Sequence, residues 1–329
     1  MKRLRRIGLV LLALVLAGVA IVVVRANLRP SLAPYQQLVR TTPGGRPSGF
    51  TVTFLGVSTL LFDDGETAFL TDGFFSRPGK LDALFGKVAP DGAAIDRVLA
   101  RAKIKRLAAV IPLHSHYDHA LDAPMVAQRT GALLVGTPSS ANVARGQGLA
   151  EDRILLAHPG DVLTLGQFTI RFLPSKHVPS ATPYEGEISQ PLEVPADVGA
   201  FREGGCLTLW IRHGDRSVLV QGSAGWIDGA LKGVHADVVY LGIGLLGKQN
   251  AAYRERYWNA LVRDTGAQRV IPIHWDDFWR PLDEPLLPLP RLADDVDASL
   301  DFLVERAYRE HVDLELPQSW LAADPYAGQ

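Results

Sequence analysis

Cysteine and methionine are almost absent from this sequence of 329 residues, and neither sign of charge dominates it. Cys206 is the single cysteine, which excludes an intrachain disulfide and any zinc site built from several thiolates. Five of the 34 basic residues lie within residues 1–25, so the remaining chain has 29 basic against 35 acidic residues, a formal charge of −6. A mildly acidic body lacks the basic surface that nucleic-acid binding requires, and we expect no nucleic-acid partner.

Long apolar runs are also rare, with one exception at the N-terminus. Residues 7–24 form an uninterrupted apolar run of 18 residues behind a basic start. This is close to the ~20 residues that cross a bilayer and longer than the ~7–15 of a signal-peptide core. Residues 1–25 are therefore predicted to be a membrane anchor or a signal segment. A signal segment would be cleaved near Val24-Arg25-Ala26. The other alternative to an anchor is a buried core helix.

The charge distribution around this run predicts its orientation. Basic residues before the run outnumber those just after it, which favours a cytoplasmic N-terminus and an exported body. The predicted location is a bacterial-type inner membrane with the body on the periplasmic side, or secretion if the segment is removed. Residues 26–48 are rich in Pro, Gly and Arg and are predicted to be a linker that tethers the body or wraps around it.

The rest of the chain, residues 49–329, is long enough for one large domain, and 47% of the chain is hydrophobic. Apolar patterns predict groups of strands separated by single helices, twice over, which fits two mixed sheets with helices outside. The predicted strands are residues 50–57, 60–62, 67–70, 107–112, 132–136, 161–165, 168–173, 206–212, 217–221, 237–241 and 269–273. The predicted helices are residues 95–102, 123–130, 139–145, 251–264 and a segment in the tail beyond residue 281. Residues 76–92 and 178–205 are predicted loops, the second forming part of a substrate-pocket rim.

Three histidines and an aspartate stand within six residues, directly after the predicted strand 107–112. They are His114, His116, Asp118 and His119. Imidazole nitrogens and carboxylate oxygens are the ligands that hold Zn²⁺, Mn²⁺ or Fe²⁺. In an extended loop, His114 and His116 point the same way because side chains alternate. They are therefore expected to bind one ion, while Asp118 and His119 reach toward a second.

The H-x-H-x-D-H pattern after a strand resembles the signature of the metallo-β-lactamase superfamily. The similarity runs from about Phe50 to Phe278, and residues 56–59 and 70–77 resemble the branch of ascorbate-phosphate lactonase-like and N-acyl-phosphatidylethanolamine phospholipase D-like hydrolases. The resemblance implies an αββα four-layer sandwich for residues 49–329, with the site where strand ends meet at one edge. It also implies further metal ligands at His177 and His274. Asp72 corresponds to a group that supports the metal loop in the family, with a simple turn role as the alternative.

Two positions depart from the family pattern. The Gly-His that opens the branch is Gly56-Val57 here, and the aspartate that usually bridges two metals is replaced by Ser223. A serine hydroxyl is a neutral and weak ligand, so it does not offset the repulsion between two cations as a carboxylate does. The second metal is therefore expected to be held more weakly, and Ser223 is at most a weak ligand.

The resemblance implies that His114, His116 and His177 hold one metal and that Asp118, His119 and His274 hold another. The expected cofactor is Zn²⁺, one or two ions, with Mn²⁺ or Fe²⁺ as alternatives. A metal-bound water has its pKa lowered toward ~7 and supplies a hydroxide nucleophile, which Asp118 is placed to orient or deprotonate as the catalytic residue.

We therefore predict an exported, membrane-tethered, metal-dependent hydrolase. The resemblance favours a phosphodiester, including one derived from a lipid, or a lactone as its small-molecule substrate. The alternatives are a class-B-like β-lactamase and a non-catalytic metal-binding or scaffold protein of the same fold. His177 lies in Lys-His-Val-Pro, which differs from the Gly-His-Thr-Pro-Gly surroundings of those β-lactamases. The sequence makes no prediction of the oligomeric state.

Overall fold

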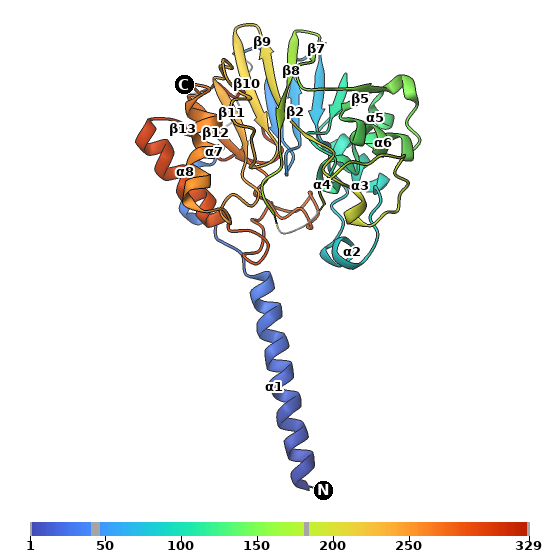
Figure 1. The fold of residues 1–329 in the computed structure, drawn as a ribbon, viewed down its shortest axis with the longest axis vertical. Helices are drawn as coiled ribbons and strands as arrows, with labels where there is room; N and C mark the ends of the chain where they lie inside the picture. Colours follow the sequence, from blue (N-terminus) through green and yellow to red (C-terminus); the bar gives the residue numbers. More distant parts are fainter. Residues whose placement is uncertain (1, 41–46, 181–183, 328–329) are drawn as a thin grey trace.

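A computed structural model describes residues 2–40, 47–180 and 184–327 of the chain. Its body is a sandwich of two seven-stranded sheets with helices on both outer faces, as Figure 1 shows. This confirms the αββα arrangement. The predicted repetition of strand groups is also confirmed, because both sheets combine an antiparallel part with a parallel part.

The first sheet holds the N-terminal strands and one strand from the C-terminus. Its strand order is β14 (Ala322–Ala323), β1 (Thr51–Phe54), β2 (Leu60–Asp63), β3 (Ala68–Thr71), β4 (Ala109–Ile111), β5 (Leu133–Gly136) and β6 (Ile154–Leu156). A hairpin joins β2 and β3, with Phe62 opposite Phe69. Strands β3 to β6 are parallel, so their C-terminal ends lie at one edge.

The second sheet holds the remaining strands. Its order is β13 (Asp313–Leu314), β12 (Arg269–Ile273), β11 (Val238–Gly242), β10 (Arg216–Gln221), β9 (Cys206–His213), β8 (Phe168–Ser175) and β7 (Val162–Leu165). Strands β10, β11 and β12 are parallel, and β8 runs in the same direction because β9 is antiparallel to both β8 and β10. The C-terminal ends of β8, β10 and β12 therefore meet at one edge.

Helices cover the outer face of each sheet. On the first sheet lie α3 (Gly92–Arg101), α4 (Tyr117–Ala120), α5 (Ala123–Thr130) and α6 (Pro138–Gly146). On the second lie α7 (Ala251–Trp258), which continues as a π-helical turn over Asn259–Arg263, and α8 (Val296–Glu310). Short 3₁₀ turns cover Ala33–Leu38, Glu151–Arg153 and Val198–Ala200. The predicted end of the helix over 123–130 is confirmed, since Gly131 closes it with a left-handed φ of 76° that glycine adopts without strain.

The core between the sheets is aromatic at its centre. The rings of Phe62 and Phe69 stack with centroids 4.9 Å apart, and Phe168 from the other sheet meets Phe69 edge-on at 5.2 Å. All three side chains are fully buried. Interdigitation of aromatic rings across the two sheets fixes their relative position, and with it the distance between the strand ends that carry the candidate ligands.

The N-terminal helix α1 (Lys2–Asn27) projects away from the body (Figure 1). Its segment Arg5–Val24 is long and apolar enough to cross a membrane and has no buried residue, a property that anchors and signal sequences share. Within the predicted linker, Pro30 and Tyr35 are buried, and the Tyr35 hydroxyl donates to Asp301 at 2.7 Å. This part of the segment packs on the body, while residues 41–46 lie outside the described residues.

One loop prediction is wrong. Residues 76–92, expected to be irregular, contain the helix α2 (Lys80–Phe85), which lies at the edge of the body from which α1 departs (Figure 1). The helix has six residues and no buried side chain, so it leaves no apolar periodicity in the sequence by which it could be recognised.

Candidate metal centre

The candidate ligands lie where several strands end at one edge of the sandwich. His114 and His116 lie in the loop after β4, and Asp118 and His119 lie in α4, the short helix that follows this loop. The loop is fixed by backbone contacts, because Leu113 N donates to Asp72 Oδ1 at 2.8 Å and Ser115 N donates to the Glu203 carbonyl at 2.9 Å. His177 follows β8, and His274 follows β12. The structure thus brings together all six residues from three places in the sequence, namely residues 114–119, His177 and His274.

The side chains form two groups, in each of which the candidate ligand atoms lie within 4.8 Å of one another. The three-histidine group consists of His114, His116 and His177. The aspartate–histidine group consists of Asp118, His119 and His274. These are the two sets that the resemblance implied, and their role as metal ligands remains a prediction.

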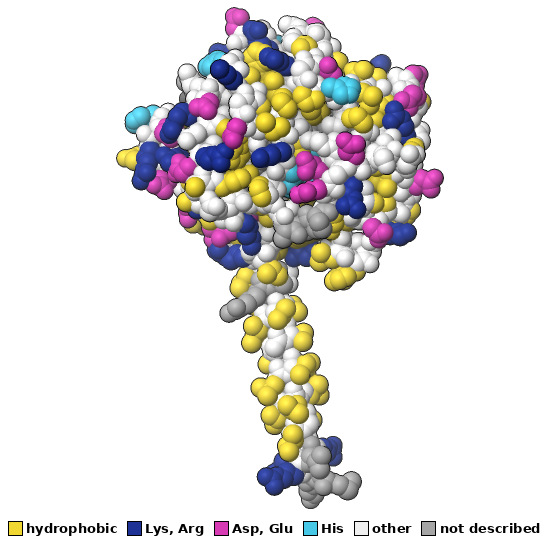
Figure 2. Space-filling model, viewed as in Figure 1, with side chains coloured by type: hydrophobic (Ala, Val, Ile, Leu, Met, Phe, Trp, Pro, Cys, Tyr) yellow, Lys and Arg dark blue, Asp and Glu magenta, His cyan; other side chains and the backbone are white. Residues whose placement is uncertain are grey.

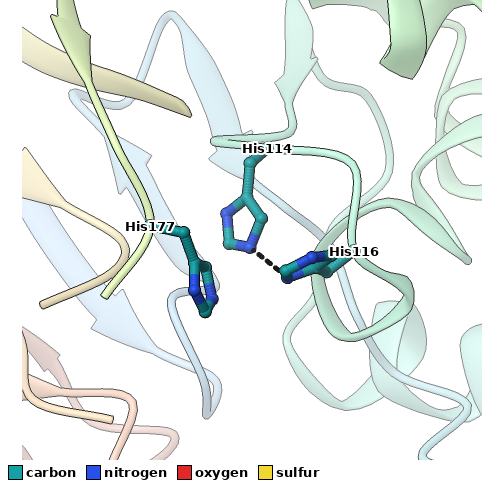
Figure 3. A group of neighbouring side chains, drawn as sticks. All are labelled: His114, His116 and His177. Atoms are coloured by element: carbon teal, nitrogen blue, oxygen red, sulfur yellow. Dashed lines mark hydrogen bonds between the residues drawn. The ribbon is translucent and has the colours of Figure 1, made fainter. Parts of the chain in front are cut away.

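In the three-histidine group the imidazoles converge on a common point (Figure 3). His114 Nε2 and His116 Nδ1 are 3.1 Å apart. The other ring nitrogen of His116 lies 3.3 Å from the Tyr184 carbonyl, and His177 Nδ1 lies 2.8 Å from the Val178 carbonyl. Because a carbonyl only accepts hydrogen bonds, it selects the tautomer in which the facing nitrogen is protonated. This leaves His116 Nδ1 and His177 Nε2 as lone-pair donors toward the centre.

In the aspartate–histidine group, the Asp72 carboxylate selects the tautomer of His119 in the same way. Asp72 Oδ2 lies 2.7 Å from His119 Nδ1, and both side chains are fully buried. Nδ1 therefore donates to the carboxylate, and His119 Nε2 faces inward, 3.7 Å from Asp118 Oδ2 and without a hydrogen-bond partner among the described residues. His274 Nε2 lies 3.4 Å from the same carboxylate oxygen. The supporting role of Asp72 is confirmed as a contact to the metal loop and its histidine.

The pKa shifts in the three-histidine group and at Asp118 suit metal binding, whereas the shift at His119 favours its protonated form in the metal-free protein. Burial and the neighbouring histidines lower the pKa of His114 well below its ordinary value, and burial lowers the pKa of His177 to about 3. Burial would also lower the pKa of His119, but the Asp72 and Asp118 carboxylates outweigh it and raise this pKa. Burial would raise the pKa of Asp118, but the histidines around it hold this pKa below its ordinary value. Neutral imidazoles and an ionised carboxylate are the forms that coordinate a metal.

The donor set and its burial fit divalent metal ions. Five imidazoles and one carboxylate supply nitrogen and oxygen ligands, which suit Zn²⁺, Mn²⁺ and Fe²⁺ alike. The unpartnered, buried Nε2 of His119 is the strongest structural sign, because a buried polar atom of this kind normally has a partner. The residues therefore fit a divalent metal site, without distinguishing zinc from the other ions.

Strained backbone conformations surround the site. His274, Asp72 and Val57 are non-glycine residues with positive φ, at 61°, 54° and 51°. His274 and Val57 are connected, since His274 N donates to the Val57 carbonyl at 2.7 Å, and Val57 N donates to Asp276 Oδ1 at 2.7 Å. Asp276 also pairs with the fully buried Arg77 at 2.7 Å. Such conformations persist only where surrounding contacts enforce them, and here they aim His274 at Asp118.

Sequence reasoning missed three contributors to this site: Tyr184, Arg77 and Asp276. The Tyr184 carbonyl orients His116, and the buried Arg77–Asp276 pair supports the strand-end loop that carries His274. Neither role has a local signal, because each depends on contacts between distant segments. The closeness of Asp276 to His274 in the chain was the nearest available hint.

Ser223 lies in the wall of the site. The resemblance implied this position, because Ser223 replaces the aspartate that usually bridges two metals in the family. Its hydroxyl accepts a hydrogen bond from Val178 N at 3.0 Å, and it borders the cavity next to the ligand groups. Gln221 fixes this turn by donating to the Ser223 carbonyl at 2.6 Å. The hydroxyl thus ties the turn after β10 to the loop that follows His177, and its weak coordination of a metal remains a prediction.

A cavity of about 310 Å³ opens over both ligand groups. Apolar side chains dominate its wall, and the loop 178–205 contributes Val178, Tyr184, Val198 and Phe201 to it. Phe278 and Trp279 line the cavity, whereas Trp226 and Trp275 are buried in the core. Residues 181–183 of the same loop lie outside the described residues.

A second cavity, of about 260 Å³, borders the three-histidine group on another side. It shares His116, His177, Val178 and Tyr184 with the first cavity, but its wall also holds three charged side chains, Lys176, Glu185 and Glu203. The candidate metal centre therefore lies between an apolar compartment and one that carries charged groups.

The four remaining histidines lie outside both ligand groups. They are His158, His213, His235 and His311. His213 packs against Phe50 and lies 3.3 Å from Asp64, and His158 is exposed beside Asp161.

The fold and the site together define an αββα protein with a candidate divalent-metal centre. Residues 52–214 match the family model described as the metallo-beta-lactamase superfamily, so the chain contains a domain of this superfamily. The matched residues include the whole H-x-H-x-D-H motif and His177, whereas Ser223 and His274 lie beyond them. The assignment to a branch of the superfamily remains a prediction.

Similar proteins agree with this assignment. A "UPF0173 metal-dependent hydrolase" from Carboxydothermus hydrogenoformans is 29% identical over 126 residues, which is 38% of this chain and 47% of that protein. The match thus spans about half the length of this curated relative. A "possible metal-dependent hydrolase" from Veillonella parvula is 15% identical, with 84% of this chain and 98% of that chain covered and a TM-score of 0.52. An isothiocyanate hydrolase from Delia radicum gut bacteria is 17% identical, with 82% and 96% covered and a TM-score of 0.50. The two solved structures show the same fold.

Proposed function

We propose that this protein is a metal-dependent hydrolase, with Zn²⁺ as its cofactor. The observation that carries the proposal is the presence of two groups of candidate ligands beside one cavity, with two members of each group in its wall. A bound divalent ion would supply Lewis acidity and a water that ionises near neutral pH. The similarity to proteins described as metal-dependent hydrolases supports the same activity.

The protein side chains have distinct tasks in this proposal. The His114, His116 and His177 imidazoles would hold the first ion, and carbonyls behind His116 and His177 set the tautomers of these two rings. Asp118 is the catalytic residue, because its carboxylate faces the cavity between two histidines and accepts a hydrogen bond from the attacking water. The apolar wall excludes bulk water, which strengthens these interactions.

The two cavities support an amphiphilic substrate. An apolar part fits the compartment lined by Phe278 and Trp279, and a polar head fits the compartment lined by Lys176, Glu185 and Glu203. The scissile bond would then lie over the ligand groups between the two compartments. A phosphodiester derived from a lipid has this character, and a lactone with an apolar chain shares it. A retained α1 anchor in an inner membrane, with the body on the periplasmic side, would keep the protein beside such substrates.

The test is hydrolysis of a substrate panel by the full-length chain in detergent, without metal and with Zn²⁺ or Mn²⁺. The panel contains phosphodiesters, lactones, thioesters and β-lactams with short and long apolar chains. The proposal expects metal-dependent turnover that His116→Ala abolishes and His158→Ala, a matched change of an exposed histidine, leaves unchanged. Turnover retained by His116→Ala would refute the site assignment. Absence of turnover across the panel in a metal-loaded protein would favour the non-catalytic alternative.

A further inference from the structure

Helix α2 exposes a group of apolar side chains that the body does not cover. Leu81, Leu84 and Phe85 are 74%, 63% and 84% exposed. Ala83 of this helix, by contrast, packs against the body's apolar residues. A soluble surface rarely gathers large apolar side chains in one place, and such patches commonly mark interaction sites.

These side chains lie beside the base of α1. The Lys80 ammonium at the start of α2 donates to the Asn27 side chain at 3.3 Å, and Asn27 is the last residue of α1. Leu28 follows, and its carbonyl accepts a hydrogen bond from Arg291 N at 2.8 Å, which brings the 71% exposed Leu292 to the same place. Leu81, Leu84, Phe85, Leu28 and Leu292 are called the α2 patch below. Figure 2 shows apolar side chains on the edge of the body from which the apolar helix departs.

The occupant of the α2 patch follows from this position. The apolar run of α1 ends at Val24, and Asn27 follows three residues later. Three residues span at most about 10 Å, so insertion of α1 into a bilayer brings the edge of the body that carries the α2 patch to the membrane surface. Cationic groups border the patch, since Lys80 lies at its edge and the Lys248 ammonium donates to the Leu292 carbonyl at 3.2 Å. Apolar side chains flanked by lysines are typical of segments that lie in the interface of a bilayer.

We propose that the α2 patch docks into the surface of the same bilayer that α1 enters, so that the body lies on the membrane instead of extending freely from its anchor. The cavity of about 310 Å³ over the ligand groups is lined by Leu84 and by Ala293, which is the neighbour of Leu292. The mouth of the cavity therefore opens at the lipid surface. If the proposed hydrolase function holds, the substrate enters from the bilayer; the docking itself does not depend on any activity.

Depth-dependent quenching tests this proposal in the full-length chain reconstituted into vesicles of zwitterionic and anionic phospholipids. A nitrobenzoxadiazole label is attached at Phe85→Cys, and quencher lipids carry a spin label at different acyl depths. Cys206 is buried and the pKa of its thiol is raised well above the ordinary value, so it stays unlabelled. The expected label depth at position 85 is about 5–10 Å below the headgroups, as for interfacial helices. The matched control is Val162→Cys, an exposed position of strand β7, whose hairpin with β8 lies at the end of the body away from α1 (Figure 1), and its label is expected to remain unquenched.

A second variant separates docking from tethering. Leu81→Asp, introduced beside the label at position 85, is expected to remove most of the quenching while α1 stays inserted and the fold stays intact by circular dichroism. Equal quenching at positions 85 and 162 would overturn the proposal. A blue-shifted but unquenched label that responds to the number of chains per vesicle would also overturn it, in favour of a second copy of the chain as the occupant.

Discussion

Replacement of Asp72 by asparagine tests how the site sets the tautomer of His119. Asp72 Oδ1 accepts from Leu113 N, and Asp72 Oδ2 accepts from His119 Nδ1 at 2.7 Å. Asparagine keeps one oxygen for Leu113 but presents an N–H group to His119. The imidazole must then accept at Nδ1 and carry its proton on Nε2, the atom that faces Asp118. A protonated Nε2 does not bind a metal.

The size of this effect follows from the fully buried position of the pair. Loss of a carboxylate behind a metal-binding histidine costs about 10–100-fold in metal affinity, or roughly 1.4–2.7 kcal/mol. This agrees with about 1.5–3 kcal/mol for a hydrogen bond to a charged group. Asp72→Asn is therefore expected to weaken the ion held by the aspartate–histidine group by one to two orders of magnitude, and to leave the three-histidine group unaffected.

The measurement is a titration of the metal-free protein with Zn²⁺ against a chromogenic chelator. Asp122→Asn is the matched control, since Asp122 is a buried carboxylate that accepts from Phe75 N and Ser76 N at 2.7 and 2.6 Å and does not contact the ligands. Asp72→Asn must lose affinity at one site, whereas Asp122→Asn must keep both. Two unchanged affinities in Asp72→Asn would refute the assignment of His119 as a ligand oriented by Asp72.

Three further predictions concern the occupancy of the second metal site, the loss of metal at low pH and a buried ion pair. Ser223→Asp is expected to raise the occupancy of the second metal by adding a negative charge between the ions, and an unchanged metal content would contradict this. On acidification from pH 7.5 to 5.5, the ion of the aspartate–histidine group should leave first. The raised pKa of His119 makes it protonate before the three histidines, whose lowered pKa values keep them neutral. Joint loss of both ions in dialysed samples would oppose this order. Arg77→Met leaves the buried Asp276 unpaired and should cost about 3–5 kcal/mol in denaturant unfolding. Arg129→Met, in an exposed pair, should cost under about 1 kcal/mol, and equal costs would count against the argument.

The local parts of the site could be predicted from the sequence. Three histidines and Asp118 lie within six residues after an apolar strand, so both the ligand types and their spacing are visible in one short segment. The strands that deliver His177 and His274 were recognisable by their apolar patterns, because β8 begins with alternating buried and exposed residues and β12 is wholly buried. The sandwich followed from the repeated strand and helix pattern, and the structure confirms it.

The parts that escaped prediction depend on contacts between distant segments. The role of Asp72 was one of two alternatives until its carboxylate was found beside His119, 47 residues away. The Tyr184 carbonyl behind His116 is a backbone group and has no residue-type signal. Helix α2 was missed because a short exposed helix buries nothing, and the sequence signal of a helix is its buried face.

The metal content of the purified full-length chain tests the central claim most directly. After dialysis against metal-free buffer at pH 7.5, elemental analysis of the wild type should find at least one divalent ion per chain, held by the three-histidine group. His116→Ala should lose that ion and keep its fold, while His158→Ala should retain it. A wild type that holds no divalent ion, or a His116→Ala protein with the same content as the wild type, would contradict the account.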